Sequence, residues 1–164
     1  MDQEQEVFKH FVNPLKAGVT KFKGVMLPVC FKDYAKEIED MEVRDTDIWV
    51  TSFPKSGTTW TQEMVYLIVS DLDYEGAKET LDKRFLHLES GILMDFKGYK
   101  ANHPEFQCVD YLIEPIKVIK NLKCRRLIKT HLPWDLLPLE IRNGTKKPKV
   151  SIPFFYSILV FIYV

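Results

Sequence analysis

Hydrophobic positions along the chain follow two spacings, and each spacing predicts a different kind of element. Apolar side chains recur every three or four positions over residues 31–43 and 58–72, which is typical of helices with one buried face. Nearly continuous apolar runs lie in "DTDIWVTSF" (45–53) and "RRLIKT" (125–130), as expected of parallel strands that are buried on both sides. The order strand, helix, connection, strand predicts an α/β fold built on a parallel sheet.

The segments between these elements carry weaker patterns. A turn or a short pair of strands is expected around residues 21–28. A further helix is predicted at 73–85, whereas residues 90–110 contain two glycines and a proline and are predicted to be irregular. Residues 109–122 have a helical period, which we expect Pro115 to break because proline lacks the amide hydrogen that a helix needs.

Composition limits the classes of function. A chain of 164 residues suffices for one ordinary domain, and its 23 basic and 23 acidic residues cancel, so bulk charge favours neither a nucleic-acid nor a membrane partner. The N-terminus lacks the basic start and apolar stretch of a secretory signal. Cys30, Cys108 and Cys124 lie far apart, without metal-ligand spacing. We therefore expect free thiols, a cytoplasmic location and no bound metal.

The segment "TSFPKSGTTW" (51–60) joins a predicted strand to a predicted helix and is rich in hydrogen-bonding groups. These groups belong to Lys55, Ser56, Gly57, Thr58 and Thr59. The first amides of a helix have no acceptor within the helix, and this end carries partial positive charge, so the segment suits an anion such as a phosphate. Gly57 permits close approach of the backbone, and Lys55 adds a full charge. The alternative is an ordinary capped helix, since serine and threonine are good caps anywhere.

The segment differs from a nucleotide-binding GxxxxGK[ST] loop. It is shorter, and its lysine precedes the glycine. No apolar run ending in aspartate follows it as a second magnesium-binding motif. A kinase-like phosphotransferase is therefore a weaker alternative, which magnesium dependence and ATP binding would favour.

Two motifs together carry a family resemblance. "FPKSGTTW" (53–60) closely resembles the phosphosulfate-binding loop of the cytosolic sulfotransferases, and "IKTHLPWDLLP" (128–138) resembles the segment that bears their catalytic histidine. The motifs occur in the family's order and at compatible spacing, and the similarity covers about residues 20–149. The resemblance implies one α/β domain, with a P-loop-like parallel sheet flanked by helices.

The resemblance also implies a reaction and its residues. The family transfers a sulfuryl group from 3′-phosphoadenosine-5′-phosphosulfate (PAPS) to a hydroxyl or amine of a small acceptor, without a metal. By resemblance, the residues that bind the 5′-phosphosulfate are Lys55, Ser56, Gly57, Thr58, Thr59 and Trp60. Lys55 would also stabilise charge on the leaving oxygen. His131 matches the general base, and Lys129 matches a lysine near the transferred group on the same face of the strand. Phe31 falls where the family places an aromatic residue of the acceptor pocket.

Simpler interpretations of these residues stay open. Trp60 can be a core residue, Phe31 can lie on the buried face of its helix, and His131 can be a histidine at a strand end. His10, His87 and His103 lack a comparable context, and we interpret them as structural. At His87 and Ser90 some phenol-preferring members carry phenylalanine, so a phenol acceptor is not implied.

The chain departs from the family after residue 149. We divide it into residues 1–149, the N-terminal part of a sulfotransferase domain, and a divergent apolar tail at 150–164. In the family, an arginine–serine pair and a later Arg-Lys-Gly segment follow and hold the 3′-phosphate of PAPS. The family's dimer segment lies still further along. This chain contains none of them.

Three interpretations of the tail are open. It can replace the family's next strand, anchor the chain in a membrane, or represent translated intron sequence in a truncated isoform. Its length and the interruptions at Pro153 and Ser157 disfavour an anchor. We favour the truncated isoform, because GTAAGT, a typical splice donor, can encode Val150 and Ser151. A sheet edge and apolar faces would then be exposed, so we expect an unstable or inactive chain. The alternative function is a non-catalytic chain that binds a partner or is degraded.

Overall fold

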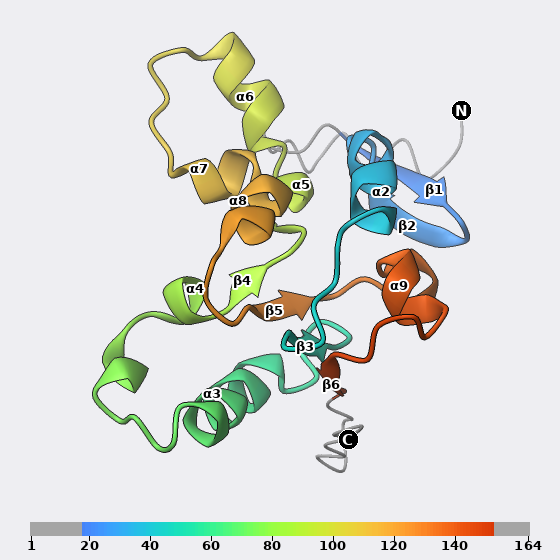
Figure 1. Cartoon of the computed structure of the whole chain (residues 1–164). Helices are drawn as coiled ribbons and strands as arrows, with labels where there is room; N and C mark the ends of the chain where they lie inside the picture. The colour runs from blue at the N-terminus through green and yellow to red at the C-terminus, as the bar shows by residue number, and fades with distance from the viewer. Residues whose placement is uncertain (1–17, 153–164) are drawn as a thin grey trace.

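A four-stranded parallel sheet forms the centre of the part that the computed structural model describes, residues 18–152 (Figure 1). Its strands lie in the order β4-β5-β3-β6, and each neighbouring pair is parallel. Their bounds are Leu86–His87 for β4, Leu127–Thr130 for β5, Ile48–Thr51 for β3 and Lys149–Ser151 for β6. The strands predicted at 45–53 and 125–130 are confirmed, although both are shorter than predicted.

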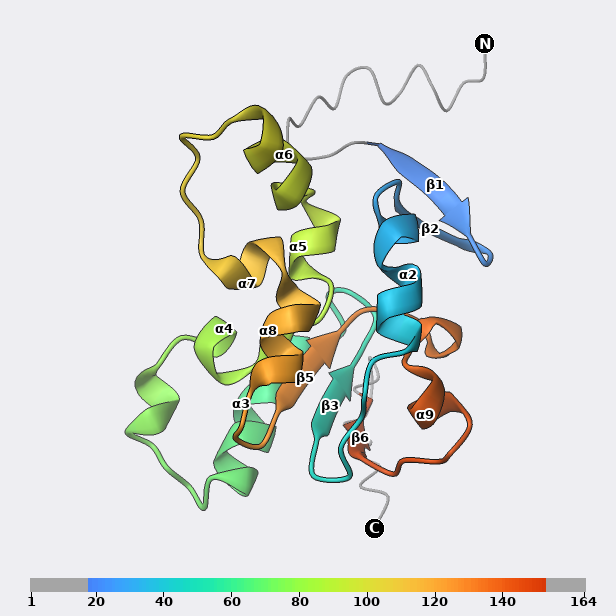
Figure 2. The ribbon, with the colours of Figure 1, turned by 45° about the horizontal axis from the view of Figure 1, so that its top comes forward.

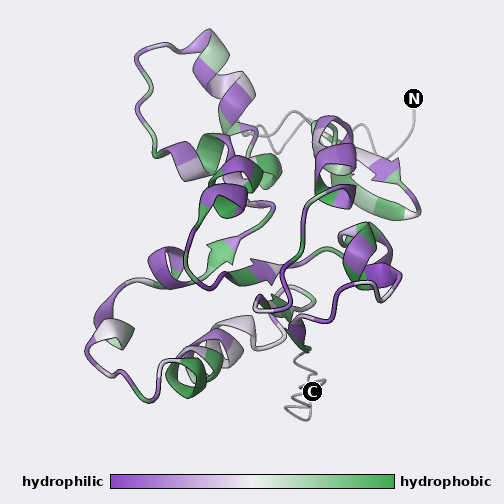
Figure 3. Ribbon diagram, in the orientation of Figure 1, coloured by the Kyte–Doolittle hydropathy of each residue, from purple (hydrophilic) through white to green (hydrophobic). Residues whose placement is uncertain are grey.

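Different helices cover the two faces of the sheet (Figure 2). Successive side chains of a strand point to opposite faces. Trp49 and Ile128 face the side on which α2 (Phe31–Glu39) and α8 (Pro115–Asn121) pack, and α3 (Thr58–Val69) packs on the other side. Figure 3 shows the consequence for the helices, since α3 and α8 are hydrophobic along part of their surface and hydrophilic along the rest. Burial on both faces explains why the strands read as apolar runs.

The helices predicted at 31–43 and 58–72 are α2 and α3, and each ends a few residues earlier than predicted. The strand pair expected around 21–28 is the antiparallel hairpin of β1 (Val19–Phe22) and β2 (Val25–Pro28). After the second central strand come a 3-10 turn, Trp134–Leu136, and α9, Leu139–Arg142. The main sequence patterns therefore yield the expected elements.

Three weaker predictions have different outcomes. The break expected at Pro115 is confirmed, because α7 (Asp110–Ile113) ends before it and α8 begins there. The helix predicted at 73–85 is wrong as a continuous element, since that stretch holds a 3-10 turn (Gly76–Lys78) and α4 (Leu81–Arg84).

The prediction that residues 90–110 are irregular is wrong for the first part of this stretch, whereas residues 103–109 have no helix or strand, as predicted. This stretch contains α5 (Ser90–Leu93) and α6 (Phe96–Asn102). The side chain of Asp95 caps α6 by accepting a hydrogen bond from the Gly98 amide at 3.0 Å. Aromatic side chains of α6 then pack with Phe106. Such local capping and packing explain why Gly98 does not prevent α6.

A buried ion pair fixes the amino ends of the two central strands. Asp47 precedes β3 and Arg126 precedes β5, and both side chains are fully buried. Arg126 Nε donates to Asp47 Oδ1 at 2.7 Å, and the Arg126 guanidinium also donates to Asp47 Oδ2 and, at 3.0 Å, to the Glu42 carbonyl. The Arg44 amide donates to the same carboxylate at 2.9 Å. Because one end of the strand pair is fixed in this way, the register at the opposite, carboxyl end is fixed too.

The structure describes only the beginning of the predicted tail. Val150 and Ser151 belong to β6, where Val150 pairs with Trp49 and Ser151 with Val50. The segment from 153 to 164 lies outside the described residues. Among the helices that are described, none is long and apolar enough to cross a membrane.

Candidate active site

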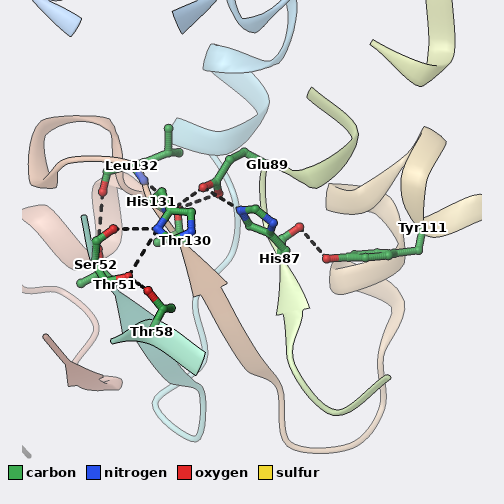
Figure 4. A network of polar contacts seen from close by, with 9 residues as sticks. All are labelled: Thr51, Ser52, Thr58, His87, Glu89, Tyr111, Thr130, His131 and Leu132. Atoms are coloured by element: carbon green, nitrogen blue, oxygen red, sulfur yellow. Dashed lines mark hydrogen bonds and ion pairs between the residues drawn. The ribbon is translucent and has the colours of Figure 1, made fainter. Parts of the chain in front are cut away.

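The two motifs singled out in the sequence meet at the carboxyl ends of β3 and β5. Thr51 and Thr130 are register partners at the ends of these strands, and the Ser52 amide donates to the Thr130 carbonyl at 3.1 Å. Ser52 begins the loop that leads to α3, and His131 follows β5. Figure 4 shows the two side chains beside each other, joined by dashed contacts. Parallel pairing therefore brings together residues that are far apart in the sequence.

Ser52 connects the loop to His131 directly. Its Oγ lies 2.6 Å from Thr58 Oγ1 and 3.3 Å from His131 Nδ1. Its backbone oxygen lies 2.8 Å from the same Nδ1. A carbonyl can only accept, so Nδ1 carries the proton and donates it to Ser52. The neutral imidazole then has its free lone pair on Nε2, which is the atom able to accept a proton.

The environment keeps His131 neutral near pH 7. Burial lowers the pKa of His131, and the charges of His87 and Lys129 act in the same direction. The hydrogen bond to the Ser52 carbonyl and the Glu89 carboxylate oppose this shift but do not cancel it. His131 is therefore ready to accept a proton over most of the physiological pH range.

The loop between β3 and α3 turns through two residues with positive φ. Lys55 has φ 65° and Gly57 has φ 94°, and α3 begins immediately after Gly57. Glycine adopts such a conformation without steric cost, whereas other residues adopt it rarely. Ser56 Oγ donates to the Phe53 carbonyl at 2.6 Å and tightens the turn.

The start of α3 presents free donors. Within the described part of the chain, no hydrogen bond is found from the backbone amides of residues 57–60. Thr61 is the first residue of the helix whose amide is paired, with the Gly57 carbonyl at 3.0 Å. The helix is twelve residues long, so its end carries appreciable partial positive charge. Free amides and this charge form the donor set that a phosphate or sulfate group needs.

The side chains of this loop divide between the interior and the surface. Thr58 is buried, and its hydroxyl is turned towards Ser52. Lys55 and Thr59 are exposed, and Ser56 is half-buried. Trp60 is 76% exposed, so the interpretation of this tryptophan as a core residue is wrong. Its role beside a nucleotide stays a prediction.

A cavity of about 550 Å³ opens beside His131. Ligand pockets commonly have volumes of roughly 300–1,000 Å³, so a small molecule fits here. The polar residues that line the cavity lie at the ends of β3 and β5, and most of the other lining residues are apolar. The lining includes Thr51, Ser52, His131, Leu27, Leu93 and Trp134.

Phe31 and Lys129 differ in their relation to this site. Phe31 does not line the cavity: its side chain is 1% exposed and belongs to the core with Trp49, as the interpretation as a buried helix residue predicts. Lys129 is half-buried in β5, and its charge contributes to the lowered pKa of His131. Lys129 is thus close to the histidine, whereas Phe31 belongs to the core.

The sequence patterns did not indicate a buried carboxylate next to His131. Glu89 Oε1 accepts from the His131 amide at 2.5 Å, and Oε2 accepts from Thr130 Oγ1 at 2.8 Å. Its side chain is 2% exposed. Burial acts to raise the pKa of Glu89, but hydrogen bonds from His87, from the His131 amide and from Thr130 outweigh it, and the pKa is lowered. A glutamate inside an apolar run, as in "FLHLES", was the available signal.

His87, which the sequence gives no context like that of His131, lies beside Glu89 and His131 in the structure. Its Nε2 lies 3.0 Å from Glu89 Oε1, and its ring meets the His131 ring edge to face, with centroids 5.3 Å apart. Tyr111 Oη donates to the His87 carbonyl at 2.6 Å and fixes the backbone there. Two histidines and one carboxylate therefore share the end of the sheet. In the described residues, no group of three or more His, Cys, Asp or Glu side chains could hold a metal ion.

Comparisons with known proteins point to one family. Residues 45–150 match the family model described as a sulfotransferase domain. The chain is 43% identical over 128 residues to luciferin sulfotransferase of Photinus pyralis, covering 76% of this chain and 33% of that protein. It is 34% identical over 149 residues to sulfotransferase 1E1 of Mus musculus, covering 85% of this chain and 45% of the relative.

A solved structure gives the same result for the fold. Retinol dehydratase in complex with retinol and PAP superimposes with a TM-score of 0.72 at 25% identity, covering 93% of this chain and 48% of that one. The chain therefore spans a third to a half of the length of these relatives. Both motifs from the sequence fall within the matched residues.

Proposed function

This chain belongs to the sulfotransferase family, and we propose that its site serves to transfer the sulfuryl group of PAPS to a hydroxyl, or an amine, of a small acceptor. The inactivity expected of a truncated chain is the alternative, and the assays below decide between the two. The observation that carries the proposal is the direct connection between the loop and the histidine. Ser52 Oγ contacts both Thr58, at the start of α3, and His131, at the end of β5. An anion held by the helix end and a base acting on an acceptor then lie within reach of one small molecule.

The loop binds the phosphosulfate in this proposal. PAPS supplies an activated sulfuryl group, and the free amides of residues 57–60 with the hydroxyl of Thr59 would donate to its oxygens. Ser56 supports this site by holding the turn through its bond to the Phe53 carbonyl. Lys55 adds the positive charge that stabilises the bridging oxygen as the S–O bond breaks. A relative of similar fold is described in complex with PAP, adenosine 3′,5′-bisphosphate, which supports a site for this nucleotide.

His131 acts as the general base. Its Nε2 lone pair takes the proton of the acceptor hydroxyl, and the electrons of the O–H bond stay on the oxygen that attacks sulfur. The Ser52 carbonyl accepts the hydrogen bond from Nδ1 and keeps the ring in the required tautomer. In this proposal Lys129, whose charge contributes to the lowered pKa of His131, adds positive charge near the transferred group.

The acceptor occupies the cavity beside His131. Its volume of about 550 Å³ and its mostly apolar lining favour a small, largely apolar molecule that presents a hydroxyl to the histidine. Solved complexes of retinol dehydratase contain retinol in one case and androsterone in another, two molecules of this kind.

The three cysteines are free, which agrees with a cytoplasmic location.

A radiolabelled transfer assay tests the proposal. The chain is incubated with ³⁵S-labelled PAPS and a panel of steroid, phenol, catecholamine and retinoid acceptors. His131→Ala should lower the rate by roughly 10²–10⁴-fold, and Lys55→Ala by roughly 10²–10³-fold. Lys78→Ala is the matched control, because this exposed lysine pairs only with Glu75 among the described residues. Transfer that is unaffected by both site variants would contradict the assignment of residues.

Binding of PAP is tested separately from turnover. A ligand at 100 times its dissociation constant stabilises the folded state by about 2.7 kcal/mol. PAP should therefore raise the melting temperature of wild type and of Lys78→Ala, and raise that of Lys55→Ala much less. If PAP gives no shift and no acceptor is sulfated, the proposed function is wrong for this chain.

A further inference from the structure

The buried carboxylate of Glu89 is the feature of the site that the proposed reaction does not yet use. Its two oxygens receive three hydrogen bonds: from the His131 amide at 2.5 Å, from Thr130 Oγ1 at 2.8 Å and from His87 Nε2 at 3.0 Å. The donors come from two strands, since His87 ends β4, while Thr130 and His131 lie at the end of β5. A carboxylate that is 2% exposed is costly unless it is well paired, so three donors around it keep it ionised.

The charge of this carboxylate faces the base. Glu89 and the Ser52 carbonyl approach His131 from two sides (Figure 4). The Glu89 carboxylate accepts from the His131 amide and fixes the backbone, whereas the Ser52 carbonyl accepts from Nδ1 and fixes the ring. When Nε2 takes a proton, the imidazole becomes a cation between them. The Glu89 charge favours that cation, because screening is weak in the interior, and it offsets part of the cost that burial imposes on the charged imidazole.

We propose that Glu89 is a positioning residue for His131, held by His87, and that its charge stabilises the imidazolium formed when His131 accepts the acceptor's proton. The inference rests on the proposed function for its meaning in catalysis. Glu89 takes no proton in the step: the O–H bond of the acceptor breaks, an N–H bond forms at Nε2, and the carboxylate stays ionised. His87 donates Nε2–H to the Glu89 carboxylate, and its ring contacts the His131 ring edge to face.

The other charged groups around the pair are few and identifiable. Lys129 lies in β5, two residues before His131, and is the register partner of His87, and its charge opposes a second positive charge at His131. Tyr111 faces His87 from α7 and stays protonated, because burial raises its pKa to about 12. Glu89 is thus the group that favours the cation at His131, against Lys129 and His87.

The test is a ¹⁵N NMR titration of the histidine side chains, which needs no turnover. In wild type, His131 should show the Nδ1–H tautomer. The pKa of His131 should fall in Glu89→Gln, because the anion is lost, and should stay near the wild-type value in Glu89→Asp, because the charge is kept. Glu105→Gln is the matched control, since Glu105 pairs with His103 in an exposed site, and it should leave His131 unchanged.

The outcomes show whether Glu89 acts on His131 through its charge or through its packing. If Glu89→Gln and Glu89→Asp change His131 equally, or if neither changes it, the inference is wrong. If Glu89→Gln does not fold, the ionisation of Glu89 is followed instead in the wild-type protein labelled with ¹³C-glutamate. The Glu89 carboxylate must remain ionised across the whole titration of His131, and protonation above or within that range would overturn the inference.

Steady-state kinetics give a second test of the role of Glu89. Glu89→Gln should lower kcat on the order of 10-fold, a part of the roughly 10²–10⁴-fold that a general base contributes, while KM for PAPS changes little. Absence of sulfate transfer in wild type would refute the proposed function, whereas the titration would still decide whether Glu89 sets the pKa of His131.

Discussion

Replacing Ser52 with alanine should weaken the connection between the loop and His131 in a measurable way. The Ser52 side chain is buried, and its hydroxyl pairs with Thr58 Oγ1 at 2.6 Å. Ser52→Ala leaves the Thr58 hydroxyl in a buried place without this partner. Leaving one buried polar group unsatisfied costs about 1–3 kcal/mol of folding free energy. The backbone carbonyl of Ser52 stays, so the bond to His131 Nδ1 is retained.

The partner substitution gives the second side of a double-mutant cycle. Thr58→Val removes the other hydroxyl and keeps the shape of the side chain. It should cost about 1–3 kcal/mol for the same reason, since Ser52 Oγ then has only the longer contact to His131, at 3.3 Å. The double variant removes both hydroxyls, so its loss should be smaller than the sum of the single losses by about 0.5–1.5 kcal/mol.

Urea unfolding monitored by tryptophan fluorescence measures these differences. With a slope of roughly 1–3 kcal/mol per molar urea, each single variant should lower the midpoint by several tenths of a molar or more, with an unchanged slope. Strict additivity of the two variants would refute the contact as a source of coupling. A stabilising Ser52→Ala would refute the buried pair altogether.

Three further predictions follow from the same structure. Asp47→Ala should cost about 3–5 kcal/mol of unfolding free energy, because it leaves Arg126 as a buried charge without its partner, and thermal unfolding measures the loss. Stability should fall on acidification. The folded-state pKa of Glu89 is lowered, so its contribution is present above the unfolded pKa and is lost as pH falls through the folded value. The folded-state pKa of His131 is lowered too, so the unfolded chain binds its proton first and stability drops as pH falls below the unfolded value near 6.5; His131→Gln should remove that part of the slope between pH 7.5 and 5.5. Gly57→Ala should cost about 1–2 kcal/mol through its φ of 94°, although no atom lies within 4 Å of the added methyl group, and should weaken PAP binding by calorimetry.

Much of the fold follows from local patterns. The apolar runs at β3 and β5 and the helical spacing of α2 and α3 are strong signals, because burial on two faces or on one face sets which residues are tolerated. The four residues of α5 are too few to show a helical period. Helix α6 was missed because its support is an aspartate cap and aromatic packing with a residue that follows it. Those contacts do not appear as a period in the sequence.

The site was predictable in its two motifs and not in the residues that join them. Lys55 and Gly57 stand in a recognisable loop, and His131 in a recognisable strand end. Ser52, Glu89 and His87 reach the site through the register of three parallel strands, which no local pattern reveals. The sequence context of His87 is ordinary, so its contacts with Glu89 and His131 could be found only from the fold.

The central claim is that the loop at residues 53–60 and His131 serve one ligand. The most direct measurement is an NMR titration of the ¹⁵N-labelled chain with PAP, followed by addition of an acceptor. The account predicts saturable shifts of the amides of Gly57, Thr58 and Thr59 on adding PAP, and a shift of the His131 imidazole on adding the acceptor. Saturable shifts in another part of the chain, with the loop and His131 unchanged, would contradict it.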